Sequence, residues 1–406
     1  MEKFGLIGKT LKHSYSKIIH GELGNYDYDL YEIAPENLKE FVLSGKLKGY
    51  NVTIPYKKDI IPYLDEVDEL ALKIGAVNTV VEKDGKRYGF NTDFLGMKYM
   101  LSRAGITLKD KVVMLLGSGG TSNTANAVVL SDGAKEVIKV SRTGEVNYQN
   151  CFERKDVEVI INTTPVGMFP NNYASPLSIS GFPNLIGVAD VIYNPNLTAL
   201  TAQAKERGIK YANGLPMLVA QAKYAMELFL DKTVSDSVIE KVLSKLEKET
   251  LNIVLIGMPG SGKTTVGKAL AELLGREFID TDLEIEKREN RDIPLIFKEN
   301  GEEYFRAVES AVIKEVGLMT GKVIATGGGV VKNKDNYFPL KSNGVIFWIK
   351  RDLSALPTDG RPLSKDIEVL KKLFEERKDF YAFFADEIIE NDTDIEKVVK
   401  EITDKL

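Results

Sequence analysis

The chain contains very little cysteine, histidine or tryptophan. Its 406 residues include one cysteine, Cys151, two histidines, His13 and His20, and one tryptophan. A single cysteine cannot form a disulfide within the chain, and so few cysteines and histidines exclude most zinc sites. Two histidines also leave little room for a serine–histidine nucleophile relay. The chemistry of the protein must therefore rest on other side chains.

Long apolar runs and a strong charge of one sign are also missing. No stretch of about 18 apolar residues is present to span a membrane, and residues 1–13 lack the apolar segment of a signal peptide. The formal net charge of −5 does not indicate a surface that binds nucleic acid. We therefore expect a cytoplasmic protein that acts on small molecules, without nucleic-acid or membrane partners. The sequence leaves the oligomeric state open, a monomer included.

Two glycine-rich segments each follow a strand-like apolar run. Residues 117–120 follow the run 112–116, and residues 257–264 follow the run 253–256. A strand that ends in glycines before a helix presents backbone N–H groups and a positive helix end to a phosphate. The first segment has no lysine, which is typical of a dinucleotide site. The second ends in lysine and threonine, which is typical of a nucleoside-triphosphate site. Two sites so far apart predict two enzymes in tandem.

Short apolar runs alternate with amphipathic stretches along the whole chain, which is the pattern of an α/β protein. The runs predict strands near 112–116, 137–140, 157–161 and 185–191, and helices near 91–104, 124–130 and 214–230. Residues 235–249 are highly charged, with leucines and valines at helical spacing. They predict a surface helix that merges into a linker. A third α/β unit begins at residue 251.

Residues 141–143, Ser141-Arg142-Thr143, stand where a NAD site normally places an acidic residue against the ribose. A guanidinium offers planar donors to a 2′-phosphate, whereas a carboxylate would repel it. The segment therefore predicts NADP as the cofactor. The alternative is that Arg142 is a solvated surface side chain.

Six further segments carry a more specific signal. They are residues 13–16 (HSYS), 51–57 (NVTIPYK), 75–79 (GAVNT), 91–93 (NTD), 162–168 (NTTPVGM) and 213–221 (NGLPMLVAQ). In order and spacing they resemble the shikimate dehydrogenase family over roughly residues 1–235. One departure is that no second basic residue follows Arg142, although NADP-specific members often have one.

The resemblance implies a role for each matched residue. A ketone reduced by hydride gains negative charge on its oxygen, which needs a proton donor beside it. Lys57 would be this catalytic donor, and Asp93 would hold its ammonium in place. The residues implied to bind the substrate are Ser14, Ser16, Thr53, Lys57, Asn78, Asp93, Tyr193 and Gln221, with the two serines at its carboxylate. Those implied to bind NADP are Gly117, Ser118, Gly119, Gly120, Thr121, Ser141, Arg142, Thr143, Gly214 and Met217.

The region after residue 250 carries a second series of segments. They are 278–282 (FIDTD), 301–306 (GEEYFR), 325–330 (ATGGGV), 361–363 (RPL) and Arg377 with Tyr381 four residues on. Together with the phosphate loop they resemble shikimate kinase over residues 250–406. The region departs from the family at residues 354–360, where members commonly carry another arginine of the lid.

This second resemblance also implies roles. ATP would be bound by Gly260, Ser261, Gly262, Lys263, Thr264, Thr265 and Arg361. Mg²⁺ would be held by Thr264 and by Asp280 through water, and shikimate by Asp282, Arg306, Gly327, Gly328, Gly329 and Arg377. Lys263 and Asp282 would be catalytic. The alternative for Arg306 is a helix-surface ion pair with Glu302 or Glu309, and for the three glycines it is a plain turn.

The two resemblances together imply a domain plan. The expected fold is α/β, with an N-terminal substrate domain, a Rossmann NADP-binding domain and a P-loop kinase domain with a parallel sheet. We expect residues 1–249 to be dehydrogenase-like, with 1–103 and about 215–240 binding substrate and 104–214 forming the Rossmann part. Residues 250–406 would be the kinase domain.

The two resemblances also imply consecutive reactions. NADPH would reduce 3-dehydroshikimate to shikimate, and ATP would phosphorylate shikimate to shikimate 3-phosphate, on the route to chorismate and aromatic amino acids. One alternative is a quinate/shikimate dehydrogenase fused to another small-molecule kinase; Ser16 argues against quinate, because some relatives that use quinate have threonine there. Another is a non-catalytic nucleotide sensor, which would have no need of the pair Lys57 and Asp93.

Overall fold

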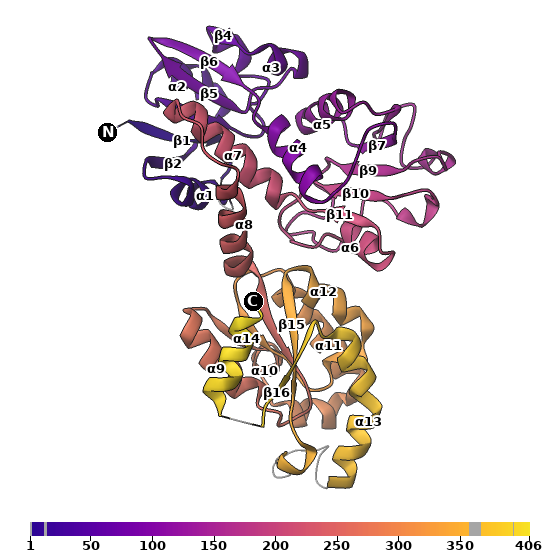
Figure 1. The fold of residues 1–406 in the computed structure, drawn as a ribbon. Helices are drawn as coiled ribbons and strands as arrows, with labels where there is room; N and C mark the ends of the chain where they lie inside the picture. The colour runs from indigo at the N-terminus through magenta and orange to yellow at the C-terminus, as the bar shows by residue number, and fades with distance from the viewer. Residues whose placement is uncertain (1, 12–13, 357–366, 393) are drawn as a thin grey trace. The chain divides into compact units, whose positions relative to one another are not determined.

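The computed structural model describes residues 2–11, 14–356, 367–392 and 394–406, and Figure 1 shows its helices and strands. The chain forms two compact units, Met1–Lys245 and Leu246–Leu406. Within the described residues, every helix is too short or too polar to cross a bilayer.

The first unit begins with a mixed six-stranded sheet in the order β2-β1-β3-β5-β6-β4. Its strands are β1 (Lys3–Gly8), β2 (Asp27–Glu32), β3 (Gly49–Val52), β4 (Glu66–Val67), β5 (Thr79–Lys83) and β6 (Lys86–Phe90), and its helices are α1 (Ser16–Leu23), α2 (Leu38–Leu43) and α3 (Glu69–Ile74). Helix α7 (Leu215–Leu230) returns to this sheet from much later in the chain. Its Ala225 and Phe229 pack against Phe4 and Leu6 of β1.

A second, wholly parallel sheet of the first unit has the order β11-β10-β9-β7-β8. Its strands are β7 (Val112–Leu116), β8 (Glu136–Val140), β9 (Val159–Asn162), β10 (Gly187–Asp190) and β11 (Lys210–Ala212), and its helices are α4 (Asp93–Arg103), α5 (Gly120–Ser131) and α6 (Ala199–Glu206). The chain continues from β7 to β8 on one side and then crosses to β9 on the other. Parallel sheets bind ligands at the carboxyl ends of the strands where the order reverses in this way.

The second unit contains a parallel sheet in the order β13-β14-β12-β15-β16. Its strands are β12 (Asn252–Ile256), β13 (Phe278–Asp280), β14 (Val323–Ala325), β15 (Gly344–Lys350) and β16 (Glu387–Glu390), and its helices are α9 (Lys263–Leu274), α10 (Thr281–Glu289), α11 (Ile293–Gly317), α12 (Tyr337–Ser342), α13 (Ile367–Phe384) and α14 (Ile395–Asp404). Helix α8 (Ser237–Thr250) precedes the sheet and contains the division between the two units.

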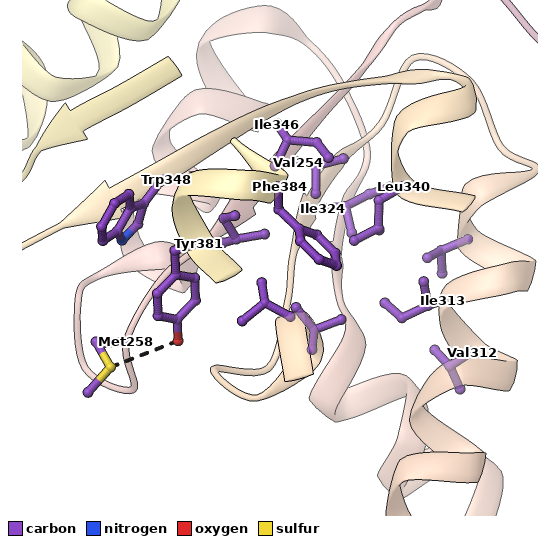
Figure 2. Packing of buried hydrophobic residues seen from close by; sticks show 14 of the residues in the cluster. Val254, Met258, Val312, Ile313, Ile324, Leu340, Ile346, Trp348, Tyr381 and Phe384 are labelled. Carbon is purple, nitrogen blue, oxygen red and sulfur yellow. Dashed lines mark hydrogen bonds between the residues drawn. The ribbon is translucent and has the colours of Figure 1, made fainter. Parts of the chain in front are cut away.

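The pleat of β12 explains why this strand is apolar at every position after its first. Ile253 and Leu255 pack with side chains of α9 and α14 on one face of the sheet. Val254 and Ile256 pack with side chains of α11 and α13 on the other face, where Figure 2 shows Phe384 of α13 beside Val254. Successive strand residues point to opposite faces, so a strand covered on both sides must be continuously hydrophobic.

The expected α/β class with parallel sheets is confirmed, and one helix differs from the expectation in where it begins. Helix α5 begins at Gly120 rather than near residue 124, so the first glycine segment runs directly into its first turn. The surface helix expected at 235–249 is present as α8, which is exposed on one side and buried on the other. Its Ile239, Val242, Leu243 and Leu246 are at most 2% exposed. These residues recur at a spacing of three and four, which places them on one side of the helix.

Candidate functional sites

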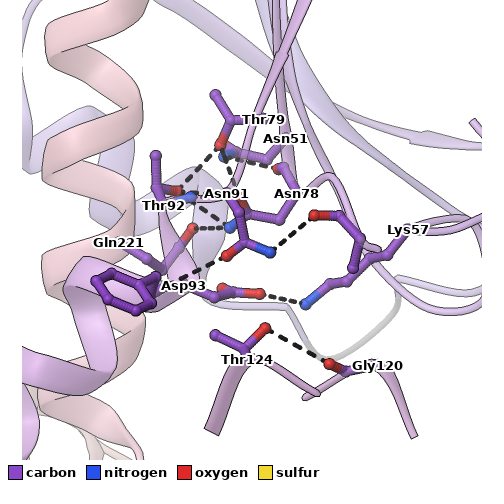
Figure 3. A network of polar contacts seen from close by, with 12 residues as sticks. Asn51, Lys57, Asn78, Thr79, Asn91, Thr92, Asp93, Gly120, Thr124 and Gln221 are labelled. Carbon is purple, nitrogen blue, oxygen red and sulfur yellow. Dashed lines mark hydrogen bonds and ion pairs between the residues drawn. The ribbon is translucent and has the colours of Figure 1, made fainter. Parts of the chain in front are cut away.

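The first site is centred on an ion pair between a loop and a helix end. Lys57 lies in the loop after β3, and Asp93 is the first residue of α4. The Lys57 Nζ and Asp93 Oδ2 atoms are 2.6 Å apart, and the two side chains are only 17% and 9% exposed. The carboxylate in the first turn of α4 is further stabilised by the helix dipole. Figure 3 shows the lysine pointing at this carboxylate. The arrangement holds one ammonium group in a fixed place with little water around it.

A buried polar network adjoins the pair. Asn78 Nδ2 donates to Thr92 Oγ1 at 3.0 Å and to Gln221 Oε1 at 3.4 Å, and Thr92 N–H donates to Asn78 Oδ1 at 2.7 Å. Gln221 comes from α7, so the return of α7 to the first sheet supplies this amide (Figure 3). Asn51 and Thr79 extend the network through a 3.1 Å bond. Neither of these two residues was assigned a role from the sequence, although Asn51 opens the segment 51–57.

The remaining residues expected at the substrate lie in three loops. Ser14 Oγ donates to Ser16 Oγ at 3.1 Å, at the start of α1. Thr53 N–H donates to the carbonyl oxygen of Ile7 in β1 at 3.0 Å. Tyr15, between the two serines, has its ring centroid 5.3 Å from that of Tyr193, which follows β10. Burial raises the pKa of Tyr193, so its phenol stays protonated. The serine segment thus meets the second sheet at Tyr193.

The first glycine loop lies at the carboxyl ends of β7, β8 and β9. Gly117 N–H donates to the carbonyl oxygen of Val140 at the end of β8, at 2.8 Å. Gly117 has φ 113°, and a Cβ there would lie 2.8 Å from Thr163 Oγ1 after β9. A Cβ at Gly119 or Gly120 would meet nothing within 4 Å. Ser118 and Gly119 are also exposed, and the first N–H groups of a helix have no acceptor within it, so this end of α5 can receive a phosphate.

The segment expected to select the cofactor directly follows β8. Ser141 N–H donates to the carbonyl oxygen of Val146 at 3.2 Å, which closes a short turn, and Arg142 and Thr143 are exposed on it. Gly214 lies so close to the chain after β10 that a Cβ would be 2.0 Å from the carbonyl oxygen of Val191. Met217 is buried and belongs to the same hydrophobic core cluster as Val113.

The second glycine loop joins β12 to α9. Lys263 Nζ donates to the carbonyl oxygens of Gly257 and Met258 at 2.9 and 3.0 Å, so the lysine folds back over the loop. Thr264 Oγ1 donates to Asp280 Oδ2 at 2.9 Å, which brings a hydroxyl and a carboxylate together at the ends of β12 and β13. Hard oxygen groups of this kind suit Mg²⁺.

A cavity of about 600 Å³ opens beside this loop. Its lining residues are Gly262, Thr265, Val266, Arg351, Asp352, Ser354, Asn391, Asp392 and Ile395. Asn391 Nδ2 donates to the carbonyl oxygen of Ser261 at 2.7 Å, which fixes the loop to the chain after β16. Neither Arg351 nor Asn391 was singled out from the sequence. Arg361 lies outside the described residues.

The acidic and glycine segments of the second unit meet across β13 and β14. Asp282 lies in the first turn of α10, very close to Gly327. A Cβ added to Gly327 would lie 2.6 Å from the Oδ1 atom of Asp282. Burial, with a smaller contribution from Asp280, raises the pKa of Asp282. A carboxylate with a raised pKa is a better proton acceptor than an ordinary aspartate.

Two arginines flank the same glycines. Arg377 Nη1 donates to the carbonyl oxygen of Gly328 at 2.9 Å, and the hydroxyl of Tyr381 donates to the same oxygen. Arg306 lies over the next glycine, where a Cβ would be 2.4 Å from its Nη2 atom. Its Nη1 atom is 2.7 Å from Glu309 Oε2, and its Nη2 atom is 3.2 Å from Glu302 Oε1. Arg306 therefore makes both ion pairs weighed from the sequence and also faces the glycine segment.

The first unit is similar to known shikimate dehydrogenases along its length. The family model of the shikimate dehydrogenase substrate binding domain matches residues 6–80. A shikimate dehydrogenase (NADP(+)) of Caldicellulosiruptor bescii is 40% identical over 280 residues, which cover 61% of this chain and 96% of the relative. One from Methanosphaera stadtmanae is 38% identical over 271 residues, covering 59% of this chain and 95% of that protein.

Solved structures agree with this similarity. A chorismate mutase/shikimate 5-dehydrogenase fusion protein from Clostridium acetobutylicum has a TM-score of 0.58 and 36% identity, covering 61% of this chain and 97% of that one. A shikimate 5-dehydrogenase from Thermus thermophilus, in complex with NADP(H) and shikimate, has a TM-score of 0.55 and 28% identity, covering 60% of this chain and 99% of that one.

The second unit matches a different family. The shikimate kinase family model covers residues 259–406, from the phosphate loop to Leu406. The chain therefore belongs to the shikimate dehydrogenase family and carries a shikimate kinase domain after it, which makes it a bifunctional enzyme of the shikimate pathway.

Proposed function

We propose that the protein reduces 3-dehydroshikimate to shikimate with NADPH and then phosphorylates the 3-hydroxyl of shikimate with ATP. The observation that carries the proposal is that each of two different phosphate loops lies in a unit with its own set of polar side chains. One set is built on an ammonium held by a carboxylate, Lys57 and Asp93, at 2.6 Å. The other is built on a partly buried carboxylate, Asp282, and two arginines, all of which lie against the glycine segment 327–329.

In the first unit, Lys57 donates its proton to the substrate ketone oxygen as charge develops there. Asp93 keeps the lysine oriented through their ion pair, in which Nζ and Oδ2 are 2.6 Å apart. Asn78 and Gln221 present amide groups to the ring hydroxyls, while Ser14 and Ser16 take the substrate carboxylate. The loops and helices that supply these groups set the orientation of the ring before reaction.

The first glycine loop and the turn after β8 fit NADPH. The uncrowded backbone at Gly119 and Gly120, at the N-terminus of α5, suits the pyrophosphate, and Arg142 is exposed where a 2′-phosphate would lie. When bound, NADPH supplies the hydride. The names of the dehydrogenase relatives, which specify NADP(+), support this choice over NAD.

In the second unit, the backbone of residues 257–264 and Lys263 hold the phosphates of ATP, and the cavity beside Thr265 takes the nucleoside. Asp282 accepts the proton of the shikimate hydroxyl, a role that its raised pKa favours. Arg306 and Arg377 hold the shikimate carboxylate by charge-assisted hydrogen bonds. Thr264 and Asp280 would hold Mg²⁺, which neutralises phosphate charge when bound.

A single assay tests both halves. The full chain is mixed with 3-dehydroshikimate, NADPH and Mg·ATP, while NADPH loss and ADP formation are followed together. We expect both signals, and ADP formation should lag until shikimate accumulates. Two other results would contradict the substrate assignment. One is NADPH formation when quinate and NADP⁺ are supplied instead, and the other is ADP formation with another acceptor but not with shikimate. Absence of both signals would contradict catalysis altogether.

A further inference from the structure

One glutamate oxygen bridges two cations at the edge of the shikimate kinase site. Glu302 Oε1 accepts hydrogen bonds from Arg306 Nε at 3.3 Å and Nη2 at 3.2 Å, and from Lys332 Nζ at 2.6 Å. The Nε and Nη2 atoms form one edge of the guanidinium, the edge that can pair with both oxygens of a carboxylate. Glu302 therefore occupies a carboxylate-binding edge of Arg306.

The two carboxylates on Arg306 are held very differently. Glu309 is 1% exposed and bonds Nη1 at 2.7 Å, so it stays with the arginine in a site closed to water. Glu302 is 50% exposed, and its contacts to Arg306 are long. Lys332 makes the largest contribution in lowering the pKa of Glu302, and Arg306 contributes less. The main partner of Glu302 is thus the lysine.

Glu302 also lies directly after a break in helix α11. Gly301, directly before it, has φ 83° and ψ 175°, which breaks α11 into two helical segments. Lys332 ends the short helix at Val330–Lys332, immediately after the glycines that Arg306 faces. The lysine and the arginine therefore approach Glu302 from two different segments, and the carboxylate can leave one cation while it keeps the other.

From this geometry we propose that Glu302 is a stand-in carboxylate, which shields Arg306 in the empty site and is displaced onto Lys332 when the substrate carboxylate binds. The proposal rests on the proposed kinase function and adds two residues that set the affinity for shikimate. Glu302 lowers this affinity by competing for the Nε and Nη2 edge. Lys332 raises it by holding the carboxylate once Glu302 has left Arg306.

The test measures the kinase KM for shikimate in the full chain at saturating Mg·ATP. Removal of a half-exposed ion pair changes an equilibrium by up to about fivefold. We expect Glu302→Gln to lower the KM by about two- to fivefold with kcat nearly unchanged, and Lys332→Ala to raise the KM by a similar factor. In the Glu302→Gln background, Lys332→Ala should have almost no further effect, because the two changes act on one contact.

Two controls separate competition from other effects. Glu303→Gln removes the same charge one residue along, and the described residues include no bond from Glu303 to Arg306; its KM should match wild type. The carboxamide of shikimate has no carboxylate to compete, so Glu302→Gln should leave its KM or inhibition constant unchanged. Thermal melting checks that each variant is folded.

The sign of the Glu302→Gln effect decides the proposal. A higher KM would mean that Glu302 orients Arg306 for the substrate, and an equal gain with the carboxamide would mean that no competition takes place; either result overturns it. A wild-type chain that phosphorylates another acceptor but not shikimate would instead refute the proposed function.

Discussion

Lys57 and its neighbour Lys58 are matched in type but differ in surroundings. Lys57 is paired with a nearly buried carboxylate, whereas the side chain of Lys58 is exposed. We expect Lys57→Ala to lower dehydrogenase kcat by roughly 10²–10⁴, the usual size of an acid–base contribution. Lys58→Ala should stay near wild type, and both variants should keep full kinase activity. NADPH consumption measures the first activity. If Lys57→Ala turned over normally, another group would have to supply the proton.

Asp190 gives the first unit a pH-dependent stability. It accepts hydrogen bonds from Asn162, Ile192 and Thr198 at 2.8–3.1 Å. Burial nevertheless raises the pKa of Asp190 from 3.8 to about 6. Because the folded state then binds the proton more tightly, Asp190 stabilises the fold below about pH 4, and this contribution is lost as pH rises through 6.

The contribution of Asp190 to the free energy of unfolding that is lost in this way amounts to ~3 kcal/mol, since each pKa unit is worth about 1.4 kcal/mol. Asp190→Asn cannot ionise, so the difference in unfolding free energy between wild type and variant should change by most of this amount from pH 4 to pH 7. Urea unfolding followed by circular dichroism measures it. The only tryptophan, Trp348, lies in the second unit, so its fluorescence provides an internal control that should not change. If the unfolding free energies of wild type and Asp190→Asn changed in parallel with pH, Asp190 would already be charged at pH 4.

At the level of single residues, short contiguous motifs could be identified in the sequence. The residues that each side chain contacts in the folded protein could not. Lys57 and Asp93 each lie in a short segment that predicts their chemistry, and the structure places them in contact. Glu302, bridging to Lys332, and Asn51, bonded to Thr79, depend on segments that approach only after folding. No local pattern in a sequence specifies such contacts, because they depend on how separate segments pack in three dimensions.

Between elements, the glycine segment of the kinase site approaches the phosphate loop very closely. A Cβ on Gly328 would lie 2.7 Å from Pro259 Cδ and 3.0 Å from its backbone nitrogen. The proline ring cannot swing aside, so Gly328→Ala must push the two segments apart. The carbonyl oxygen of the same glycine anchors Arg377 and Tyr381.

We expect Gly328→Ala to raise the KM values for shikimate and ATP together by about tenfold or more, because overpacking typically costs about 1–3 kcal/mol. Steady-state kinase kinetics measure both values, and dehydrogenase activity is the control that should not change. Gly21→Ala offers a matched substitution, since a Cβ there meets nothing within 4 Å. Unchanged KM values in Gly328→Ala would show that the two segments have room to separate.

For whole elements, continuous apolar runs predicted the central strands, and apolar residues at helical spacing predicted the helix α8. Runs such as 112–116 and 253–256 are hydrophobic at every position because both faces of their sheets are covered. In α8 the charged residues outnumber the buried apolar ones, yet four apolar side chains at helical spacing are buried. Spacing, rather than overall charge, was the signal that determined burial.

For the molecule as a whole, α8 belongs partly to each unit. In its first half, Glu240 pairs with Arg103, and Lys245 pairs with Glu22. After residue 246 its backbone bonds to the second unit: Arg276 donates to the carbonyl oxygens of Lys248 and Leu251, and Gly321 N–H donates to that of Thr250. From the sequence, the kinase domain was expected to begin at residue 250. We now propose that its folding unit begins about one helical turn earlier.

This placement predicts the behaviour of two fragments of the second unit. All described residues assigned to ATP, Mg²⁺ and shikimate, including those that line the cavity proposed for the nucleoside, lie between Gly257 and Ile395, within that unit. A fragment of residues 246–406 should therefore fold and phosphorylate shikimate, and Asp282→Asn in it should abolish this activity without unfolding it. A fragment of residues 252–406 lacks the carbonyl groups that satisfy Arg276 and Gly321. Each lost hydrogen bond costs about 0.5–1.5 kcal/mol, so the shorter fragment should melt at a lower temperature than the longer one.

Circular dichroism melting and ADP formation measure the two properties on the same preparations. Equal melting temperatures would show that the end of α8 contributes nothing to the kinase fold and that the boundary lies after residue 251. A folded 246–406 fragment that bound ATP but did not phosphorylate shikimate would be more serious. Since Asp282, Arg306 and Arg377 would all be present, that result would mean that the first unit supplies a group to the kinase reaction, and the two activities would then depend on the intact chain.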